Sequence, residues 1–290
     1  MSASRASAPR PGAQPNALRR RALLLGLASA AVGLTGCTSA VRVGPTAAAV
    51  AATPSPTPTP TPAPTPPPRP VPTTTAAPVP VRARFPLPQG TITELPGDGS
   101  LMAWTVDDGS DSDVVAAYAQ FAKDTGTRLT FFLNGKYDSW TVNAPALAPL
   151  VAGGQVQLAN HTWSHADLTS LSTDGIQEEL GRNGEFIRAT YGVEAAPFYR
   201  PPFGYTDARS RTAAAAIGYT ATTLWYGSLS DSGRITPEQL LGFADEWFRP
   251  QRIVIGHANF DPVTTVYAQL VDLLRERSLQ TVTLRDVFAV

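Results

Sequence analysis

Seven short apolar runs in the C-terminal two thirds of the chain constrain its fold most. They cover residues 101–106, 129–133, 156–159, 198–200, 220–224, 253–255 and 281–283. Each is rich in β-branched or aromatic residues, which is typical of strands buried in a parallel sheet. Amphipathic helical patterns lie between them, at residues 114–121 and 176–187 and after Thr236-Pro237. The pattern predicts an α/β fold, a distorted (β/α) barrel of seven strands. An open doubly wound sheet is the alternative, although no Gly-rich phosphate loop follows its first strand.

Charge is divided unequally along the chain. Residues 1–93 hold nine arginines and no Asp or Glu, whereas residues 94–290 hold 14 Lys or Arg against 23 Asp or Glu. An acidic domain repels phosphate backbones, so we expect no nucleic-acid partner. About 200 residues suffice for one domain with a sizeable core, which we expect to be a monomer.

The first 36 residues have the composition of an export signal. Three arginines at 19–21 precede an uncharged apolar run at 22–34, which is too short to span a bilayer and has the length of a signal-peptide h-region. The run ends in LTGC at 34–37, which looks like the lipobox of bacterial lipoproteins. We therefore expect residues 1–36 to be a lipoprotein signal peptide and Cys37 to carry the lipid, with a plain secretory signal as the alternative. The arginines are compatible with either Tat or Sec export.

A proline-rich segment separates Cys37 from the apolar runs. Residues 53–80 contain 13 prolines among 28 residues. Such a segment has no large side chains to bury and should form an extended tether of roughly 3 Å per residue. We place the linker at residues 37–84 and the globular domain at 85–290. An anchored domain on a long tether indicates a protein on the extracellular face of the cell membrane, with a cell-envelope substrate.

Reactive side chains follow the carboxyl ends of the predicted strands. In chain order they are Asp107, Asp108, His161, His165, Arg200, Asp231 and His257. All three histidines of the chain are among them. The carboxyl ends of barrel strands converge on one face, where catalytic groups collect. We therefore expect these residues to share one pocket.

The spacing of two histidines and two carboxylates suggests a metal site. Asp107 and Asp108 are adjacent at a strand end, so their side chains point in different directions and can take different roles. His161 and His165, four residues apart, are expected on one face of a helical turn. A carboxylate with two imidazoles leaves coordination positions open, which suits a hydrolytic divalent metal, with zinc expected and cobalt, nickel or manganese as alternatives. The competing interpretation is two partly buried histidines hydrogen-bonded to the backbone.

Four segments together resemble a known family. They are TVDDG at 105–109, HTWSH at 161–165, RPPFG at 200–204 and IVIGH at 253–257. Their order and approximate spacing are similar to those of the polysaccharide deacetylases, the NodB-homology domain of carbohydrate esterase family 4, over about residues 98–290. The resemblance implies a distorted (β/α) barrel and metal-dependent removal of acetyl groups from an N-acetylated or O-acetylated sugar.

The resemblance also implies roles for matching residues. They are Asp108, His161 and His165 as metal ligands, Asp107 as base, His257 as acid, Arg200 holding Asp107, and the backbone N–H of Phe203 facing the oxyanion. These residue types suit the chemistry independently. A metal polarises the acetamide carbonyl and lowers the pKa of its bound water toward about 7, so that a nearby carboxylate can complete the deprotonation. The departing amine must be protonated, and a histidine can supply that proton near neutral pH.

Three positions depart from the family pattern. Asp231 is retained, but Ser232 stands where a Trp is expected, so we expect the pocket wall to differ from the family pattern. Asp231 itself could pair with His257 or be a solvated loop carboxylate. Val106 replaces the usual Phe, which changes the packing beneath the site. The segment 258–260, ANF, stands in place of the usual acidic residue after His257, and the sequence offers no physical account of that change.

Three functions remain open on the sequence. The leading one is a deacetylase acting on peptidoglycan or a chitin-like polymer. The others are a non-catalytic glycan-binding lipoprotein and an esterase or amidase acting on another acetylated glycan such as xylan. Sugar rings stack on aromatic side chains, so we expect the substrate to contact Trp163, Trp225, Tyr226 and Phe203, and Ile255 beside them. The alternative is that these aromatic residues serve only to pack the barrel mouth.

Overall fold

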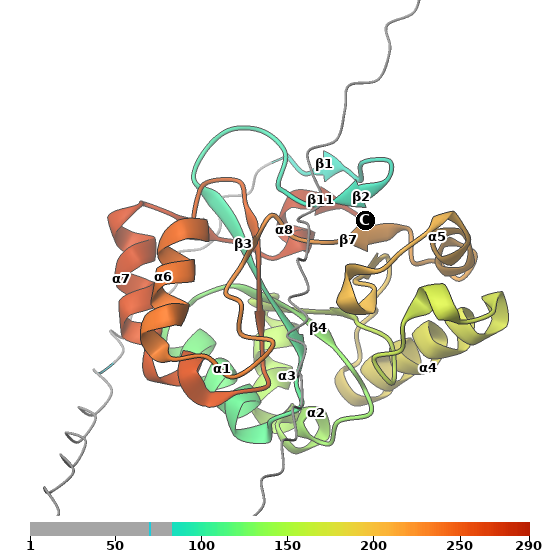
Figure 1. Cartoon of the computed structure of the whole chain (residues 1–290), viewed down its shortest axis with the longest axis horizontal. Helices are drawn as coiled ribbons and strands as arrows, with labels where there is room; N and C mark the ends of the chain where they lie inside the picture. The colour runs from blue at the N-terminus through green and yellow to red at the C-terminus, as the bar shows by residue number, and fades with distance from the viewer. Residues whose placement is uncertain (1–69, 71–82) are drawn as a thin grey trace, which may run out of the picture. The chain divides into compact units, whose positions relative to one another are not determined.

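The computed structural model describes residue 70 and residues 83–290 (Figure 1). The expected signal peptide, Cys37 and nearly all of the expected linker lie outside the described residues. No helix of the described part has both the length and the apolar character of a membrane span.

The described part contains short strands alternating with helices. The strands are β1 (Phe85–Pro86), β2 (Thr91–Ile92), β3 (Leu101–Asp108), β4 (Leu129–Leu133), β5 (Val156–Asn160), β6 (Phe198–Tyr199), β7 (Ala221–Thr223), β8 (Gly227–Ser228), β9 (Ile253–His257), β10 (Gln280–Thr281) and β11 (Phe288–Ala289). The helices are α1 (Ser112–Thr125), α2 (Ser139–Val142), α3 (Ala144–Ala152), α4 (Thr173–Tyr191), α5 (Ala208–Ala215), α6 (Pro237–Trp247), α7 (Tyr267–Glu276) and α8 (Leu284–Val287). Three short 3₁₀ turns cover Leu168–Ser170, Pro202–Gly204 and Asp261–Thr265. All seven predicted strands are present.

Nine of the strands form one parallel sheet. Their order is β2-β7-β6-β5-β4-β3-β9-β8, with β10 paired to the start of β3. Strands β3 to β7 follow one another without reversal, which is the order of a barrel, whereas a doubly wound sheet reverses at its switch point. Among the described residues no pairing joins β2 to β8, so the barrel is open along that seam. The predicted distorted (β/α) barrel is confirmed, but seven strands is too few, because the two-residue strands β2 and β8 leave no apolar run in the sequence.

The alternation of side chains along β3 divides the core into two layers. Met102, Trp104 and Val106 point outward into the cluster shared with the helices, while Leu101 and Ala103 belong to a smaller cluster inside the barrel. Figure 1 shows the helices arranged around the sheet, with α6 and α7 on one side and α4 and α5 on the other. The inner face of β3 continues through Thr105 to Asp107, because successive side chains alternate between faces. The strand therefore carries Asp107 into the barrel mouth.

Helix α1 starts close behind the end of β3. The Asp111 carboxylate accepts hydrogen bonds from the main-chain N–H groups of Asp113 and Val114, at 2.9 and 3.1 Å, which caps the helix. Gly126, at φ 72°, ends it in the left-handed conformation. The connection from strand to helix is consequently short, and it holds Asp108 at the barrel rim.

Candidate active site

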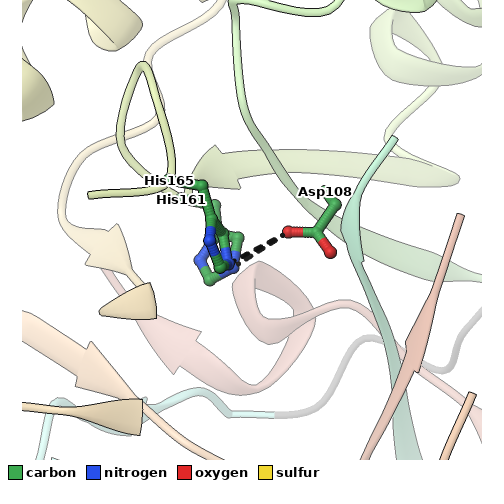
Figure 2. Close-up of side chains that lie close together, drawn as sticks. All are labelled: Asp108, His161 and His165. Atoms are coloured by element: carbon green, nitrogen blue, oxygen red, sulfur yellow. Dashed lines mark ion pairs between the residues drawn. The ribbon is translucent and has the colours of Figure 1, made fainter. Parts of the chain in front are cut away.

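Three side chains converge at the carboxyl ends of the strands, as Figure 2 shows. Asp108 Oδ1 lies 3.3 Å from His161 Nε2 and 3.4 Å from His165 Nε2. One ligand atom from each residue lies within 4.8 Å of the other two. Two imidazole nitrogens and one carboxylate oxygen thus face a common point.

The backbone at Asp108 is held in an unusual conformation. Asp108 has φ 70°, a left-handed geometry that a residue with a side chain adopts rarely. Its carbonyl accepts hydrogen bonds from the Trp140 indole at 3.0 Å and from the Asn134 main chain at 3.2 Å. Gly109 follows at φ 89°, and a Cβ there would lie 2.2 Å from the Trp140 ring. The chain turns here because glycine allows the indole to pack against it.

The loop that carries the two histidines is irregular, so the predicted helical turn is wrong. Thr162 and His165 both have positive φ, at 69° and 64°. The reason is a contact with helix α4. The Glu179 carboxylate accepts hydrogen bonds from both the main-chain N–H and the hydroxyl of Ser164, each at 2.8 Å. This contact draws the loop toward α4. His165 itself adopts the left-handed conformation, and its side chain reaches the site from the loop and not from the face of a helix.

Buried asparagine side chains support the same loop. Asn134 Nδ2 donates to the carbonyls of His161 and Thr162, at 2.5 and 3.0 Å. Asn160 Oδ1 accepts from Thr162 N and from Asn183 Nδ2, both at 2.8 Å. These amides satisfy main-chain groups that the irregular loop leaves without ladder partners. None of the three asparagines could be predicted from the sequence, because nothing in their spacing indicates the contact.

The orientation of the His161 ring is fixed by one hydrogen bond. Its Nδ1 lies 2.8 Å from the Arg200 carbonyl, which can only accept, so Nδ1 carries the proton and Nε2 faces Asp108. Burial lowers the pKa of His161, but the Asp107 and Asp108 carboxylates raise it, and the balance is a raised pKa. The pKa of His165 is lowered by burial and by the neighbouring His161. Burial raises the pKa of Asp108, yet its close charge interactions with the neighbouring histidines outweigh burial and hold that pKa well below its usual value.

The geometry of this cluster fits a divalent metal ion. Asp108 Oδ1 is buried and has no hydrogen-bond partner, although the two Nε2 atoms lie beside it. An ionised carboxylate with two imidazole nitrogens is a donor set that zinc and similar ions accept. The cluster could therefore hold such an ion while leaving coordination positions open.

Asp107 lies beside the cluster and is paired with a buried arginine. Arg200 Nη1 donates to Asp107 Oδ1 at 2.6 Å and to Thr105 Oγ1 at 2.9 Å. The other oxygen, Asp107 Oδ2, lies 3.5 Å from His161 Nε2. Arg200 has no exposed surface, and its guanidinium lies 4.1 Å from the ring centre of Phe132. The structure thus brings Arg200 to Asp107, as the resemblance implied.

His257 faces the cluster from the end of β9 and is held by Asp231. Asp231 Oδ1 lies 2.9 Å from His257 Nδ1, and its Oδ2 accepts from the His257 main-chain N–H at 3.1 Å. Burial lowers the pKa of His257, but the hydrogen bond and charge of Asp231 raise it, and the pKa is raised overall. Asp231 is buried, so it is a partner of His257 and not a solvated loop carboxylate.

A pocket of about 490 Å³ surrounds these groups. Of the residues expected to contact substrate, Phe203, Trp225 and Ile255 line it. Phe203 has φ 61° and is 58% exposed, and its ring centre lies 4.6 Å from that of His165. Ser228 and Ser232 also line it, so hydroxyl groups occupy part of the wall where an indole was expected. A second cavity of about 560 Å³, lined by Arg128 and other residues, contains no histidine.

The structure does not bring Trp163 or Tyr226 into this pocket. The Arg182 guanidinium lies 3.9 Å from the Trp163 ring centre, and Phe186 packs on the same ring, which fixes it against α4. Tyr226 is 48% exposed and lies under the Arg252 guanidinium, at 3.5 Å. Both aromatic rings therefore have neighbours that direct them away from the reactive groups.

Comparisons with known proteins agree with this geometry. Residues 95–222 match the family model described as polysaccharide deacetylase. Chitin deacetylase 1 of Cryptococcus neoformans var. grubii is 28% identical over 184 residues, which cover 62% of this chain and 37% of that protein. The uncharacterized protein SCO4760 of Streptomyces coelicolor is 34% identical over 142 residues, which cover 48% and 53% of the two chains. The chain thus spans between about a third and a half of the length of these relatives.

Solved structures share the fold. The Bc1960 peptidoglycan N-acetylglucosamine deacetylase aligns with a TM-score of 0.62 at 20% identity, over 68% of this chain and 92% of that one. BA3943 of Bacillus anthracis, a CE4 family pseudoenzyme, aligns with a TM-score of 0.61 at 19% identity, over 70% and 72%. An active enzyme and a pseudoenzyme have the same barrel, so the fold alone does not decide activity. The family assignment rests on the sequence match: residues 95–222 match the polysaccharide deacetylase family.

Proposed function

We propose that the domain is a metal-dependent hydrolase that removes acetyl groups from an N-acetylated polysaccharide of the cell envelope, peptidoglycan or a chitin-like polymer. The observation that carries the proposal is the convergence of Asp108, His161 and His165 in one pocket with Asp107 and His257. The relatives named as chitin and peptidoglycan deacetylases support this substrate class.

The metal ligands in this proposal are Asp108, His161 and His165, with zinc as the expected ion. The fit rests on the unpartnered Asp108 Oδ1 and on the two Nε2 atoms directed at it. A bound divalent ion would supply Lewis-acid polarisation of the acetyl carbonyl and would acidify a water molecule. The proton transfers are assigned to side chains of the protein itself.

Asp107 is the proposed base. Its Oδ1 is engaged by Arg200, so Oδ2 is the oxygen left to accept a proton from the attacking water. Arg200 also donates to Thr105 Oγ1 and to the carbonyls of Thr223 and Leu224, so its own position is fixed. A base held by a rigid buried arginine keeps its direction through the reaction, as preorganised sites require.

His257 is the proposed acid. Asp231 occupies Nδ1, so the free nitrogen, Nε2, is available to donate a proton to the departing amine. The raised pKa of His257 favours the protonated ring near neutral pH, which an acid of this kind needs. We further propose that the main-chain N–H of Phe203, which lines the pocket, donates to the oxyanion as it forms.

One alternative has a specific observation in its favour. A bifunctional xylanase/xylan deacetylase of Cellvibrio japonicus is 24% identical over 175 residues, which cover 60% of this chain and 26% of that protein. An ester of an acetylated glycan such as xylan could therefore be the substrate. The same residues would act, but an alkoxide leaves more readily than an amine, so the reaction would depend less on His257.

A single panel of substrates tests both proposals. The purified protein, with added zinc, is incubated with peptidoglycan, chitin oligomers and acetylxylan, and released acetate is measured. We expect release from the N-acetylated polymers, abolished by a chelator and by Asp107→Asn. Release from acetylxylan alone would support the esterase. Binding of the polymers without any acetate release would indicate a non-catalytic glycan-binding protein and would contradict both enzymatic proposals.

We also propose that the protein is anchored through a lipid on Cys37, on the extracellular face of the cell membrane. The support is the sequence pattern of residues 1–37 and the proline-rich linker that follows. Each buried CH₂ of an acyl chain contributes about 0.8 kcal/mol to membrane partitioning, so a multiply acylated cysteine holds a protein firmly. Cys37→Ala should block lipid attachment without changing acetate release in detergent extracts. Wild-type protein found in the medium without lipid by mass spectrometry would contradict the anchor.

A further inference from the structure

Asn259 contacts both Ser110, in the loop after β3, and the Asp108 carboxylate. It lies two residues after His257, where the chain leaves β9, and it is half-buried. Its Nδ2 donates to Asp108 Oδ2 at 2.6 Å. Its Oδ1 accepts from the Ser110 main-chain N–H at 3.1 Å and from the Ser110 hydroxyl at 2.7 Å.

The orientation of the Asn259 amide follows from its partners. The main-chain N–H of Ser110 can only donate, so the atom facing it must be Oδ1. An ionised carboxylate can only accept, so the atom facing Asp108 must be Nδ2. Both ends of the amide are satisfied in this orientation, and the opposite one would leave both contacts repulsive.

This contact makes the two oxygens of Asp108 different. Oδ2 is occupied by the amide of Asn259, whereas Oδ1 has no hydrogen-bond partner and lies next to the Nε2 atoms of His161 and His165. The carboxylate is therefore arranged to offer one oxygen to an ion. Without the amide, both oxygens would be free to turn toward it.

We infer that Asn259 is a positioning residue, which fixes Asp108 as a ligand that binds a divalent ion through one oxygen only. The inference rests on the proposed metal site. At this position an amide can donate to the carboxylate of Asp108, whereas an acidic side chain would repel it. Groups that hydrogen-bond a ligand in this way usually change metal affinity by 10- to 100-fold when removed.

A purely structural role for Asn259 would have different consequences. Its two bonds to Ser110 already join the loop after β9 to the loop after β3, and that link alone could serve to hold the rim together. A structural link would affect stability but not the number of oxygens that Asp108 offers. The coordination of the metal is thus the measurement that separates the two roles.

The test is cobalt binding by the full chain, followed by the visible d–d absorption of Co²⁺, with Asn259→Leu and Asn259→Ala. We expect the Kd for Co²⁺ to rise about 10- to 100-fold. We also expect the d–d band to weaken, because Asp108 becomes free to bind with both oxygens and the coordination number rises. Asn143→Ala is the matched control, since the Asn143 amide bonds to Ser112 and Ser139 and to none of the three ligands. That variant should keep the wild-type Kd and spectrum.

Each other outcome overturns the inference. A folded Asn259→Leu protein with a Kd within twofold of wild type and an unchanged spectrum would show that Asn259 does not act on the metal. Loss of the native circular dichroism in both Asn259 variants would assign the residue a structural role. A wild-type protein that binds no cobalt would overturn the proposed metal site as well, which distinguishes that failure from the first two.

Discussion

Asp231 holds His257 at two points, with one carboxylate oxygen on the ring Nδ1 and the other on the main-chain N–H of the same residue. The pair fixes both the rotation of the imidazole and the position of the strand end that carries it. Nδ1 is occupied, so proton transfer at this ring is confined to Nε2. The relationship therefore gives His257 a single direction in which it can act.

Replacing Asp231 by Asn should shift the pH dependence of catalysis. The carboxylate raises the pKa of His257, and the amide keeps a hydrogen-bonding group but removes the charge, so the pKa should fall. An acid with a lower pKa loses its proton at lower pH. The basic limb of the kcat profile should consequently move to lower pH, whereas His257→Ala should lower kcat by about 10²- to 10⁴-fold. Asp261→Asn, which changes an exposed partner of Arg234, is the control and should leave the profile in place. An unmoved basic limb in Asp231→Asn would show that His257 is not the acid.

Arg200→Met should lower the stability of the fold as well as the rate of the proposed reaction. The substitution leaves the buried Asp107 carboxylate without its cation, and breaking a buried pair in this way costs about 3–5 kcal/mol of unfolding free energy. Urea denaturation measures the loss. The double variant Arg200→Met with Asp107→Asn should recover part of it, because no charge is then left unpaired. Arg188→Met, in an exposed pair with Glu194, should leave the urea midpoint unchanged. Equal midpoints for the single and double Arg200 variants would argue against this explanation.

Zinc affinity should increase with pH through the neutral range. His161 has a raised pKa in the metal-free protein, so it holds a proton that a metal ion must displace from Nε2. His165 has a lowered pKa and Asp108 is ionised well below neutral pH, so neither releases a proton there. Calorimetry in buffers of different ionisation enthalpy should then count about one proton displaced from His161 per zinc at pH values below the pKa of His161, and progressively less as the pH rises through that pKa. His161→Ala should remove this pH-dependent release. A Kd independent of pH between about 6 and 8 would contradict the raised pKa.

Gly109→Ala should destabilise the protein, because Gly109 has φ 89° and its missing Cβ position lies 2.2 Å from the Trp140 ring. The left-handed conformation alone costs an alanine about 1–2 kcal/mol, and displacement of the indole adds to that. The matched control is Gly181→Ala in α4, where nothing lies within 4 Å of the new methyl group. That substitution should stabilise by about 0.5–1 kcal/mol, because glycine is unfavourable inside a helix. Changes in unfolding free energy of the same sign for both variants would contradict this explanation of the turn.

The sequence predicted the parts of the site that depend on local pattern. The strands could be found from their apolar runs, and the position of Asp107, Asp108 and His257 at strand ends follows from those runs and the parallel connection. The pairing of Asp231 with His257 was only one of two outcomes compatible with the sequence, because a loop residue carries no signal of burial.

Contacts between distant segments could not be predicted. His161 and His165 have helical spacing, but they lie in an irregular loop. Its shape depends on Glu179, which contacts it from helix α4. Asn259 donates to Asp108 across 151 positions of the chain, and a single asparagine has no pattern that points to a carboxylate. Trp163 and Tyr226 resembled sugar-binding aromatics by type, yet arginines that pack on their rings fix them elsewhere.

Arg200 lies wholly inside the barrel, whereas His165 stands at its partly open rim. Selection therefore acts differently on the two residues. In a lineage that no longer needs the reaction, substitution of His165 should cost little folding stability. Substitution of Arg200 leaves a buried carboxylate without its cation, so the protein unfolds. Decay of activity in such a barrel should begin at the rim and reach the interior last. A descendant that has lost catalysis is then best identified by its rim histidines, since an intact Arg200–Asp107 pair reports only that the barrel still folds.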